Sequence, residues 1–312
     1  MNFLRKAIII GIAPIFLSFS AIAEIKVVTT IKPIHSLVSG VMDGVSNPTL
    51  IIESSNNPHN FSLKPSHAKM LEEADIVFWI GEDLESFMEK PLSSLSKDAV
   101  KISFMDLPSI KKLKFREKNI FDDHDDHDGH EDEHEGHDDH GHHHGEFDAH
   151  IWLDPSNAIE MVLEISHELS EIDPDNAAKY EQNANKAIAS LNNLINEISS
   201  NTPKDASYIV FHDAYQYFEN RFGVSSAGAL TLNPDVLPGA KQIDAIQDLI
   251  QDENIKCIFS EPQYNPKIIE TLAADMKIST GIMDPLGAFI DQGPEMYNQL
   301  ILNIANPLKD CR

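Results

Sequence analysis

The sequence has little cysteine and few basic residues. Only Cys257 and Cys311 occur among 312 residues, and 24 Lys and Arg face 50 Asp and Glu, which gives a formal net charge of −26 at pH 7. So acidic a chain repels nucleic acid and anionic lipid and suits small cations. Nucleic acid is therefore not an expected partner.

Phosphate-binding glycine motifs are missing as well. Neither the P-loop pattern G-x-x-x-x-G-K-[ST] nor the dinucleotide pattern G-x-G-x-x-G occurs in the chain. Both motifs cradle phosphates with backbone N–H groups at the start of a helix. The chain therefore does not itself drive a transport cycle with ATP.

Long apolar runs are absent except at the N-terminus. Arg5 and Lys6 precede the apolar residues 7–19, and Ala-Ile-Ala at 21–23 fits a signal-peptidase site. A membrane anchor is the alternative, but the run is short for a span. We expect residues 1–23 to be a cleaved signal peptide and the mature chain to be periplasmic. An exported pair, Cys257 and Cys311, is most simply a disulfide, with two free thiols as the alternative.

Short β-branched runs alternate with helical patterns on either side of a long helical stretch. The predicted strands are residues 25–30, 48–54, 74–81, 99–103, 206–211, 224–229, 255–260 and 278–283. The predicted helices between them include 34–42, 64–73 (with Ser66 as N-cap), 240–251 and 267–276. Such alternation predicts an α/β fold with two lobes, each a parallel-type sheet flanked by helices.

Residues 156–200 read as helical almost throughout, with a break at Asp173-Pro174, where Asp173 can cap and Pro174 suits a first turn. We therefore expect an N-terminal lobe over residues 24–155, a linking helical segment over 156–200 and a C-terminal lobe over 201–312. The chain is expected to be a monomer.

Residues 118–147 are of low complexity and bury little, so we expect a disordered loop. Its nine histidines are candidate weak metal sites: His124, His127, His130, His134, His137, His140, His142, His143 and His144. Residues 130–134 spell the metalloprotease pattern H-E-x-x-H, but flanking glycines and the lack of an apolar face indicate a chance match. Elsewhere, His167 is expected on a solvated helix face, and His35 and His67 near the lobe surface.

Four metal-capable residues fall at predicted strand ends or just before a helix: His59, His150, His212 and Asp284. In open α/β sheets, ligands bind outside the carboxyl ends of strands. Taken singly, each has an ordinary alternative, a hydrogen-bonded histidine or a turn-starting aspartate. Taken together, three imidazoles with a carboxylate or water form a tetrahedral set that suits Zn²⁺, with bonds of about 2.0–2.1 Å.

Several local sequences resemble the periplasmic zinc-uptake solute-binding proteins of ABC transporters, the ZnuA type. They are PHNFSLKPS, DAHIWLDPSNA, FHDAYQYFE, NPDVLPGAKQIDAI, EPQYNPKIIETLAADM and MDPLG, in this order over nearly the whole mature chain. The resemblance implies two lobes bridged by a long rigid helix, with one metal between them. It also implies a membrane permease and its cytoplasmic ATPase as partners.

The resemblance places ligands on His59, His150 and His212. Manganese-type relatives carry glutamate at the position of His212, so this residue favours zinc. Asp284 matches an aspartate ligand of many relatives, whereas some zinc members use a glutamate where this sequence has Pro58. The fourth ligand is thus Asp284 or water. Cys257 and Cys311 match a disulfide of some members, and the His-rich loop matches an accessory loop with proposed roles in capture, delivery or sensing.

Three other functions stay open on the sequence. A manganese-binding transporter component would share the fold, and a zinc buffer or adhesin would share the site. A zinc-dependent hydrolase would need an open coordination position and a general base, for which Asp213 or Glu261 is a nominal candidate. Turnover by the zinc-loaded protein would distinguish a hydrolase from a carrier.

Overall fold

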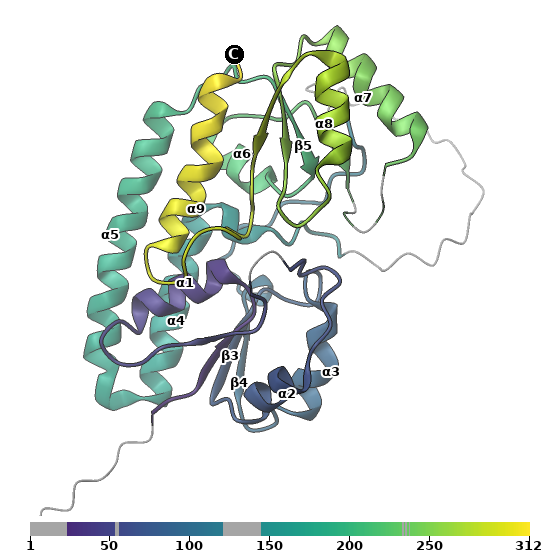
Figure 1. Ribbon diagram of the computed structural model, residues 1–312. Helices are drawn as coiled ribbons and strands as arrows, with labels where there is room; N and C mark the ends of the chain where they lie inside the picture. Colours follow the sequence, from purple (N-terminus) through teal and green to yellow (C-terminus); the bar gives the residue numbers. More distant parts are fainter. Residues whose placement is uncertain (1–23, 54–55, 121–144, 233, 235, 237) are drawn as a thin grey trace, which may run out of the picture.

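The computed structural model describes residues 24–53, 56–120, 145–232, 234, 236 and 238–312 (Figure 1). The predicted signal peptide, the nine histidines of the predicted weak sites and the H-E-x-x-H match lie outside the described residues. Both ends of the predicted loop, 118–120 and 145–147, are ordered, with bridges Ile120↔Gly228 and Lys114↔Phe147. Among the described residues, no helix combines the length and apolarity needed to cross a membrane.

The first sheet is parallel and has the strand order β2-β1-β3-β4. Its strands are β1 (Val27–Thr29), β2 (Thr49–Leu50), β3 (Ile76–Trp79) and β4 (Val100–Ser103). The helical elements between and after them are α1 (Lys32–Val41), α2 (Pro65–Glu72), η1 (Ser86–Met88), α3 (Glu89–Ser94) and η2 (Phe104–Asp106). All four predicted strands are confirmed, with β2 shortened to two residues.

The second sheet repeats this plan with the order β6-β5-β7-β8, again parallel. Its strands are β5 (Tyr208–His212), β6 (Gly228–Thr231), β7 (Cys257–Ser260) and β8 (Ser279–Ile282). Its helices are α6 (Gln216–Phe222), α7 (Ala240–Asp252) and α8 (Lys267–Met276). The two-lobed α/β fold is thus confirmed.

Two long helices and the C-terminal helix flank both sheets on one side (Figure 1). They are α4 (Pro155–Ile172), α5 (Ala177–Asn201) and α9 (Met296–Ala305), with η3 (Ile151–Leu153), η4 (Pro174–Asn176) and η5 (Asn306–Asp310) at their ends. Helix α5 packs along α4 and also contacts α1 and α9. It therefore bridges elements that belong to the two ends of the chain.

The starts of two helical elements, α2 and η4, differ from the prediction. Helix α2 begins at Pro65 after an extended Lys64, so Ser66 lies inside the helix and is not its N-cap. Pro65 determines where the helix begins, because the fixed φ and the missing N–H of proline suit the first helical position. Pro174 does begin a turn, but the Asp173 carboxylate accepts from the side chains of Asn176 and Tyr180 at 2.7 Å each and caps no backbone N–H.

One hydrophobic core runs through both lobes. Buried side chains from β1 and β3, from α4 and α5, and from β5 and α9 belong to a single cluster. A second cluster lies between the other face of the second sheet and helices α7 and α8. Because protein cores pack densely, the shared cluster makes the lobes resist independent displacement.

The predicted disulfide is present. Cys257, the first residue of β7, is bonded to Cys311, with their Cα atoms 5.5 Å apart. The bond spans a separation of 54 residues and ties the chain end after η5 to the second sheet. Closing a loop of this length stabilises by about 4 kcal/mol in the chain-entropy model.

Candidate metal centre

Three histidines that are far apart in the sequence meet between the two sheets. His212 is the last residue of β5, His59 follows β2, and His150 directly precedes η3. One ligand nitrogen from each lies within 4.8 Å of the others. His150 and His212 are only 4% and 3% exposed. The three histidines that the strand-end argument selected thus lie together, where they could hold a metal ion.

Carboxylates behind two of these rings define the direction of their lone pairs. Asp148 Oδ1 lies 2.7 Å from His150 Nδ1, and it also accepts the His150 backbone N–H at 2.9 Å. Glu261 Oε1 and Oε2 lie 2.7 and 2.9 Å from His212 Nδ1. A carboxylate only accepts, so each Nδ1 carries the proton and each Nε2 carries a lone pair.

The two Nε2 atoms face each other at 3.3 Å. Two lone pairs at this distance repel unless a cation or a proton lies between them. A tetrahedral zinc with bonds of about 2.0–2.1 Å places two nitrogen ligands roughly 3.3–3.4 Å apart. The observed spacing matches that edge of a zinc site.

His59 completes a triangle of imidazoles. Its ring centroid lies 5.4 Å from that of His150 and 5.8 Å from that of His212. The backbone N–H of His59 donates to Asn57 Oδ1 at 2.9 Å, which fixes the turn before it. His59 therefore reaches the cluster from the loop between β2 and α2 of the first lobe, whereas His212 comes from β5 of the second.

The space at the three histidines is small. The cavity measures about 10 Å³, and its lining also includes Trp152, Tyr264, Pro285 and Leu286. That volume suits one ion or one water molecule. A peptide or another organic substrate does not fit beside the imidazoles, which disfavours a hydrolase.

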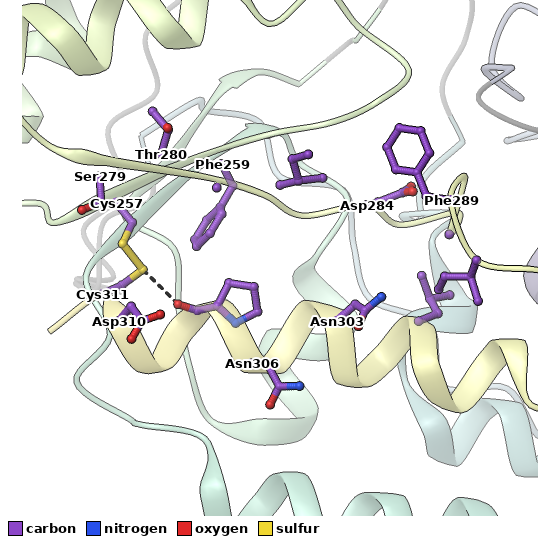
Figure 2. Close-up of a pocket in the computed structure, with 16 residues that line it drawn as sticks. Cys257, Phe259, Ser279, Thr280, Asp284, Phe289, Asn303, Asn306, Asp310 and Cys311 are labelled. Carbon is purple, nitrogen blue, oxygen red and sulfur yellow. Dashed lines mark hydrogen bonds between the residues drawn. A yellow bond between two sulfur atoms is a disulfide. The ribbon is translucent and has the colours of Figure 1, made fainter.

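Asp284 does not join the cluster. Its Oδ1 accepts from Gln263 Nε2 and from the Leu286 backbone N–H at 2.9 Å each, and its Oδ2 accepts from the Ala288 backbone N–H. It lines a different cavity of about 600 Å³ between β8 and α9, which reaches from Phe289 to the disulfide (Figure 2). The carboxylate thus shapes the loop after β8.

That loop is held by side chains from elsewhere in the chain. The Lys32 ammonium donates to the carbonyls of Gly287 and Ile290 at 2.6 and 2.5 Å, and to that of Ala288 at 3.3 Å. Trp152 Nε1 donates to Pro285 O at 2.8 Å. Burial lowers the pKa of Lys32, while Asp284 and Asp291 oppose this shift. One wall of the metal cavity is therefore fixed from α1 and η3.

The two nominal general bases are both engaged. Glu261 holds His212, as described above. Asp213 Oδ1 accepts from Arg116 at 2.7 Å, and Arg116 also donates to Glu219 at 2.6 Å. Burial raises the pKa of Asp213 to about 7 although Arg116 opposes the shift. Both carboxylates thus hold neighbouring side chains in place: Glu261 holds His212, and Asp213 holds Arg116.

The other described histidines lie outside the centre. His167 is exposed on α4, as predicted. His35 and His67 are buried, at 7% and 8% exposure, so the prediction that they lie near the surface is wrong. His35 Nε2 lies 3.2 Å from Pro48 O, and His67 Nδ1 accepts the Lys64 N–H at 3.2 Å. Local backbone partners offset the burial of both rings.

Sequence reasoning missed the carboxylates that orient the ligands. Asp148 stands two residues before His150, and this short spacing is a weak signal that could have been used. Glu261 is 49 residues from its partner, so only the pairing of β5 with β7 brings it to His212.

Fold and site together define a class. This is a two-lobed α/β protein with a small cavity between two parallel sheets, lined by three histidines that could hold a metal ion. The family model described as "Zinc-uptake complex component A periplasmic", ZnuA, matches residues 27–311. The chain therefore belongs to the ZnuA family.

Similar proteins with known names belong to the same family, and solved structures have the same fold. The chain is 44% identical over 303 residues to the high-affinity zinc uptake system protein ZnuA of Brucella abortus, covering 91% of each chain. It is 33% identical to the ZnuA of Yersinia pestis, covering 93% of this chain and 92% of that protein. A zinc-bound ZnuA deletion mutant superposes with a TM-score of 0.74 at 21% identity, covering 92% and 97%. The laminin-binding protein of Streptococcus agalactiae does so at 0.73 and 21%, covering 92% and 100%. These two structures support the fold.

Proposed function

We propose that this protein captures one Zn²⁺ in the periplasm on His59, His150 and His212 and delivers it to an ABC permease driven by a cytoplasmic ATPase. The observation that carries this is the 3.3 Å contact between two Nε2 atoms whose Nδ1 atoms each face a buried carboxylate. Such an arrangement is built for a cation. The mature chain starts at Glu24 after signal-peptide removal and acts as a monomer.

Zinc is favoured over manganese by the donor set. Imidazole nitrogens suit Zn²⁺, whereas Mn²⁺ prefers more carboxylate oxygens. The two carboxylate oxygens of Asp284 accept hydrogen bonds from three N–H donors, so Asp284 supplies no oxygen ligand in this arrangement. We propose water as the fourth ligand, which gives the three-histidine, one-water set common for zinc.

The His-rich segment has an accessory role in this proposal. Its nine histidines bind further zinc ions weakly and pass them to the main site. The ordered flanks support this role, because residue 147 precedes Asp148 and His150 by only a few residues. The segment thus leads directly into one of the three ligands.

Metal titration of a segment-replaced protein tests the proposal. Residues 121–144 are exchanged for a Gly/Ser linker, so that the ordered anchors at 120 and 145–147 stay intact. One tight zinc per molecule is expected, with the weaker ions gone. A matched variant with His150→Ala and His212→Ala on the same background should lose the tight ion. Loss of tight binding on segment replacement alone would contradict the proposal.

Selectivity gives a second test. His212→Glu replaces an imidazole by a hard oxygen donor and should shift the binding ratio from zinc toward manganese. Competition titration with both metals measures the ratio. In cells, loss of the protein should impair growth only when zinc is scarce. A zinc buffer or an adhesin without transport would not give that zinc-dependent growth defect.

A further inference from the structure

A half-buried glutamine beside the three histidines has an acceptor without a partner. Gln263 lines the same small cavity as His59, His150 and His212. Among the described residues, its Oε1 is buried and has no hydrogen-bond partner. A buried polar oxygen without a partner costs free energy, so native proteins seldom keep one idle. An unused acceptor on this wall indicates a donor that enters with the ligand.

The orientation of this amide is fixed by its other end. Gln263 Nε2 donates to Asp284 Oδ1 at 2.9 Å, and the same oxygen accepts the Leu286 N–H. The Asp284 carboxylate therefore acts as an acceptor, so the NH₂ group of Gln263 has to face it. A flipped amide would set oxygen against oxygen. The unpaired Oε1 is thus a consequence of the contact with Asp284.

We propose that Gln263 is a positioning residue for the water that completes zinc coordination, with its Oε1 accepting a hydrogen bond from that water. This inference rests on the proposed function. Water bound to zinc is a strong donor, because the cation draws charge from its O–H bonds. The cavity of about 10 Å³ has room for a single small species beside the imidazoles.

The neighbouring carboxylates are poor alternatives for this role. Glu261 faces His212 Nδ1 with both oxygens, and Asp284 accepts three N–H donors. A neutral amide oxygen holds the water without adding negative charge to the site. The fourth ligand thereby stays exchangeable, which suits a protein that has to release its ion.

The test compares Gln263→Met with wild type in the full mature chain, loaded with less than one equivalent of metal so that the tight site fills first. Methionine keeps the length of the side chain but removes the acceptor. Gln247→Met, at a half-buried glutamine of α7 that does not line this cavity, is the matched control for the exchange of glutamine by methionine. Two quantities are measured: the visible d–d spectrum of Co²⁺ bound in place of Zn²⁺, and the rate of zinc transfer to a chelator.

Gln263→Met should change the Co²⁺ spectrum and speed zinc loss by roughly threefold to tenfold, the effect of one hydrogen bond. Gln247→Met should leave the spectrum and the rate unchanged. A Gln263→Met spectrum and rate equal to wild type would overturn the role of Gln263 while leaving the three-histidine site standing. Absence of tight metal in the wild type would instead overturn the proposed function.

A structure of the zinc-loaded protein gives an independent readout. The proposal expects an oxygen about 2.0–2.2 Å from zinc and about 2.5–3.0 Å from Gln263 Oε1. An Asp284 oxygen bound to zinc in that position would refute it.

Discussion

Buried carboxylates behind the ligand rings decide how well the histidines present their lone pairs. Asp148 and Glu261 are 1% and 3% exposed, and each lies 2.7 Å from the Nδ1 of its histidine. A carboxylate at that place holds the ring in one orientation and keeps the Nε2 lone pair directed into the cavity. Zinc affinity should therefore depend on residues that do not touch the ion.

The Asp148→Asn variant tests this at the level of one residue. It keeps the shape of the side chain and removes the charge, so zinc should bind roughly tenfold to hundredfold more weakly. Chelator competition on the segment-replaced protein measures the change. Asp98→Asn, on an exposed residue far from the site in sequence, is the control and should bind as wild type. An unchanged affinity would mean that Asp148 only supports the fold.

The buried carboxyl of Glu85 should make the free energy of unfolding depend on pH, independently of metal binding. Burial raises the pKa of this carboxyl to about 7, against the opposing backbone N–H groups of Ile80 and Gly81. The folded state thus binds more protons than the unfolded state between about pH 4.5 and 7. The contribution of Glu85 to stability is then full at acid pH and declines as pH rises through that window.

Glu85→Gln imitates the protonated acid and should remove this decline. Metal-free wild type and variant should have similar unfolding midpoints near pH 5. At pH 8 the variant should be more stable, by on the order of 3 kcal/mol. Urea unfolding at several pH values measures the difference, in which the titration of the histidines cancels. Parallel curves for the two proteins would show that Glu85 is ionised throughout.

The clustering of the three histidines could be predicted from the sequence, but the side chains that orient them could not. His212 ends β5, His150 directly precedes η3 and His59 lies in the loop that follows β2. The rule that ligands bind beyond the carboxyl ends of parallel strands selects all three. The partnership of His212 with Glu261 and the three N–H contacts of Asp284 depend on side-chain directions across separate loops. Those directions have no local pattern.

Among the secondary-structure elements, the loop after β8 depends on the N-terminus of α1. The Lys32 ammonium has three N–H groups, and it meets the carbonyls of residues 287, 288 and 290. All three donors are thus satisfied, in a place where burial lowers the pKa of the lysine. This contact holds the segment that carries Pro285 and Leu286 into the metal cavity.

Lys32→Met should loosen that segment. Several carbonyls would lose their only charged donor, which we expect to lower the free energy of unfolding by about 1–3 kcal/mol. Hydrogen exchange of residues 286–290 should also quicken. Lys26→Met is the matched control, because Lys26 forms an exposed ion pair with Glu73 at 3.0 Å, and such pairs stabilise little. Equal effects of both substitutions would argue against the contact.

The elements themselves were largely readable in the sequence. Buried parallel strands are continuous β-branched and apolar runs, as at 74–81, so all eight were found. Helix α8 has the predicted bounds Lys267–Met276. The prediction of Ser66 as the N-cap of α2 was wrong because the preceding Pro65 already begins the helix. The order shown by residues 118–120 comes from pairing with β6 far along the chain, which composition does not reveal.

For the molecule as a whole, the three histidines come from both lobes, so metal binding should depend on how the lobes are held together. His59 comes from the first sheet and His212 from the second, while the shared core and α5 join the lobes on one side. In the proposed function, zinc held by these histidines adds a second connection between the lobes. An ion that binds only the folded state stabilises by RT ln(1 + [Zn]/Kd), about 4 kcal/mol at a thousandfold excess over Kd.

Zinc should therefore protect both sheets together, and this protection should require His59. In the segment-replaced protein, saturating zinc should slow hydrogen exchange in β3 and in β7 alike, because opening either lobe releases the ion. His59→Ala cuts the ligand from the first sheet and leaves His150 and His212 in place. In that variant, the protection of β3 and β7 should fall together, because the ion loses one of its three protein ligands and binds more weakly. Exchange measured by mass spectrometry with and without zinc resolves the two sheets. Protection confined to one sheet in the unmodified site would show that the ion binds within a single lobe, and the coupling argued here would be wrong.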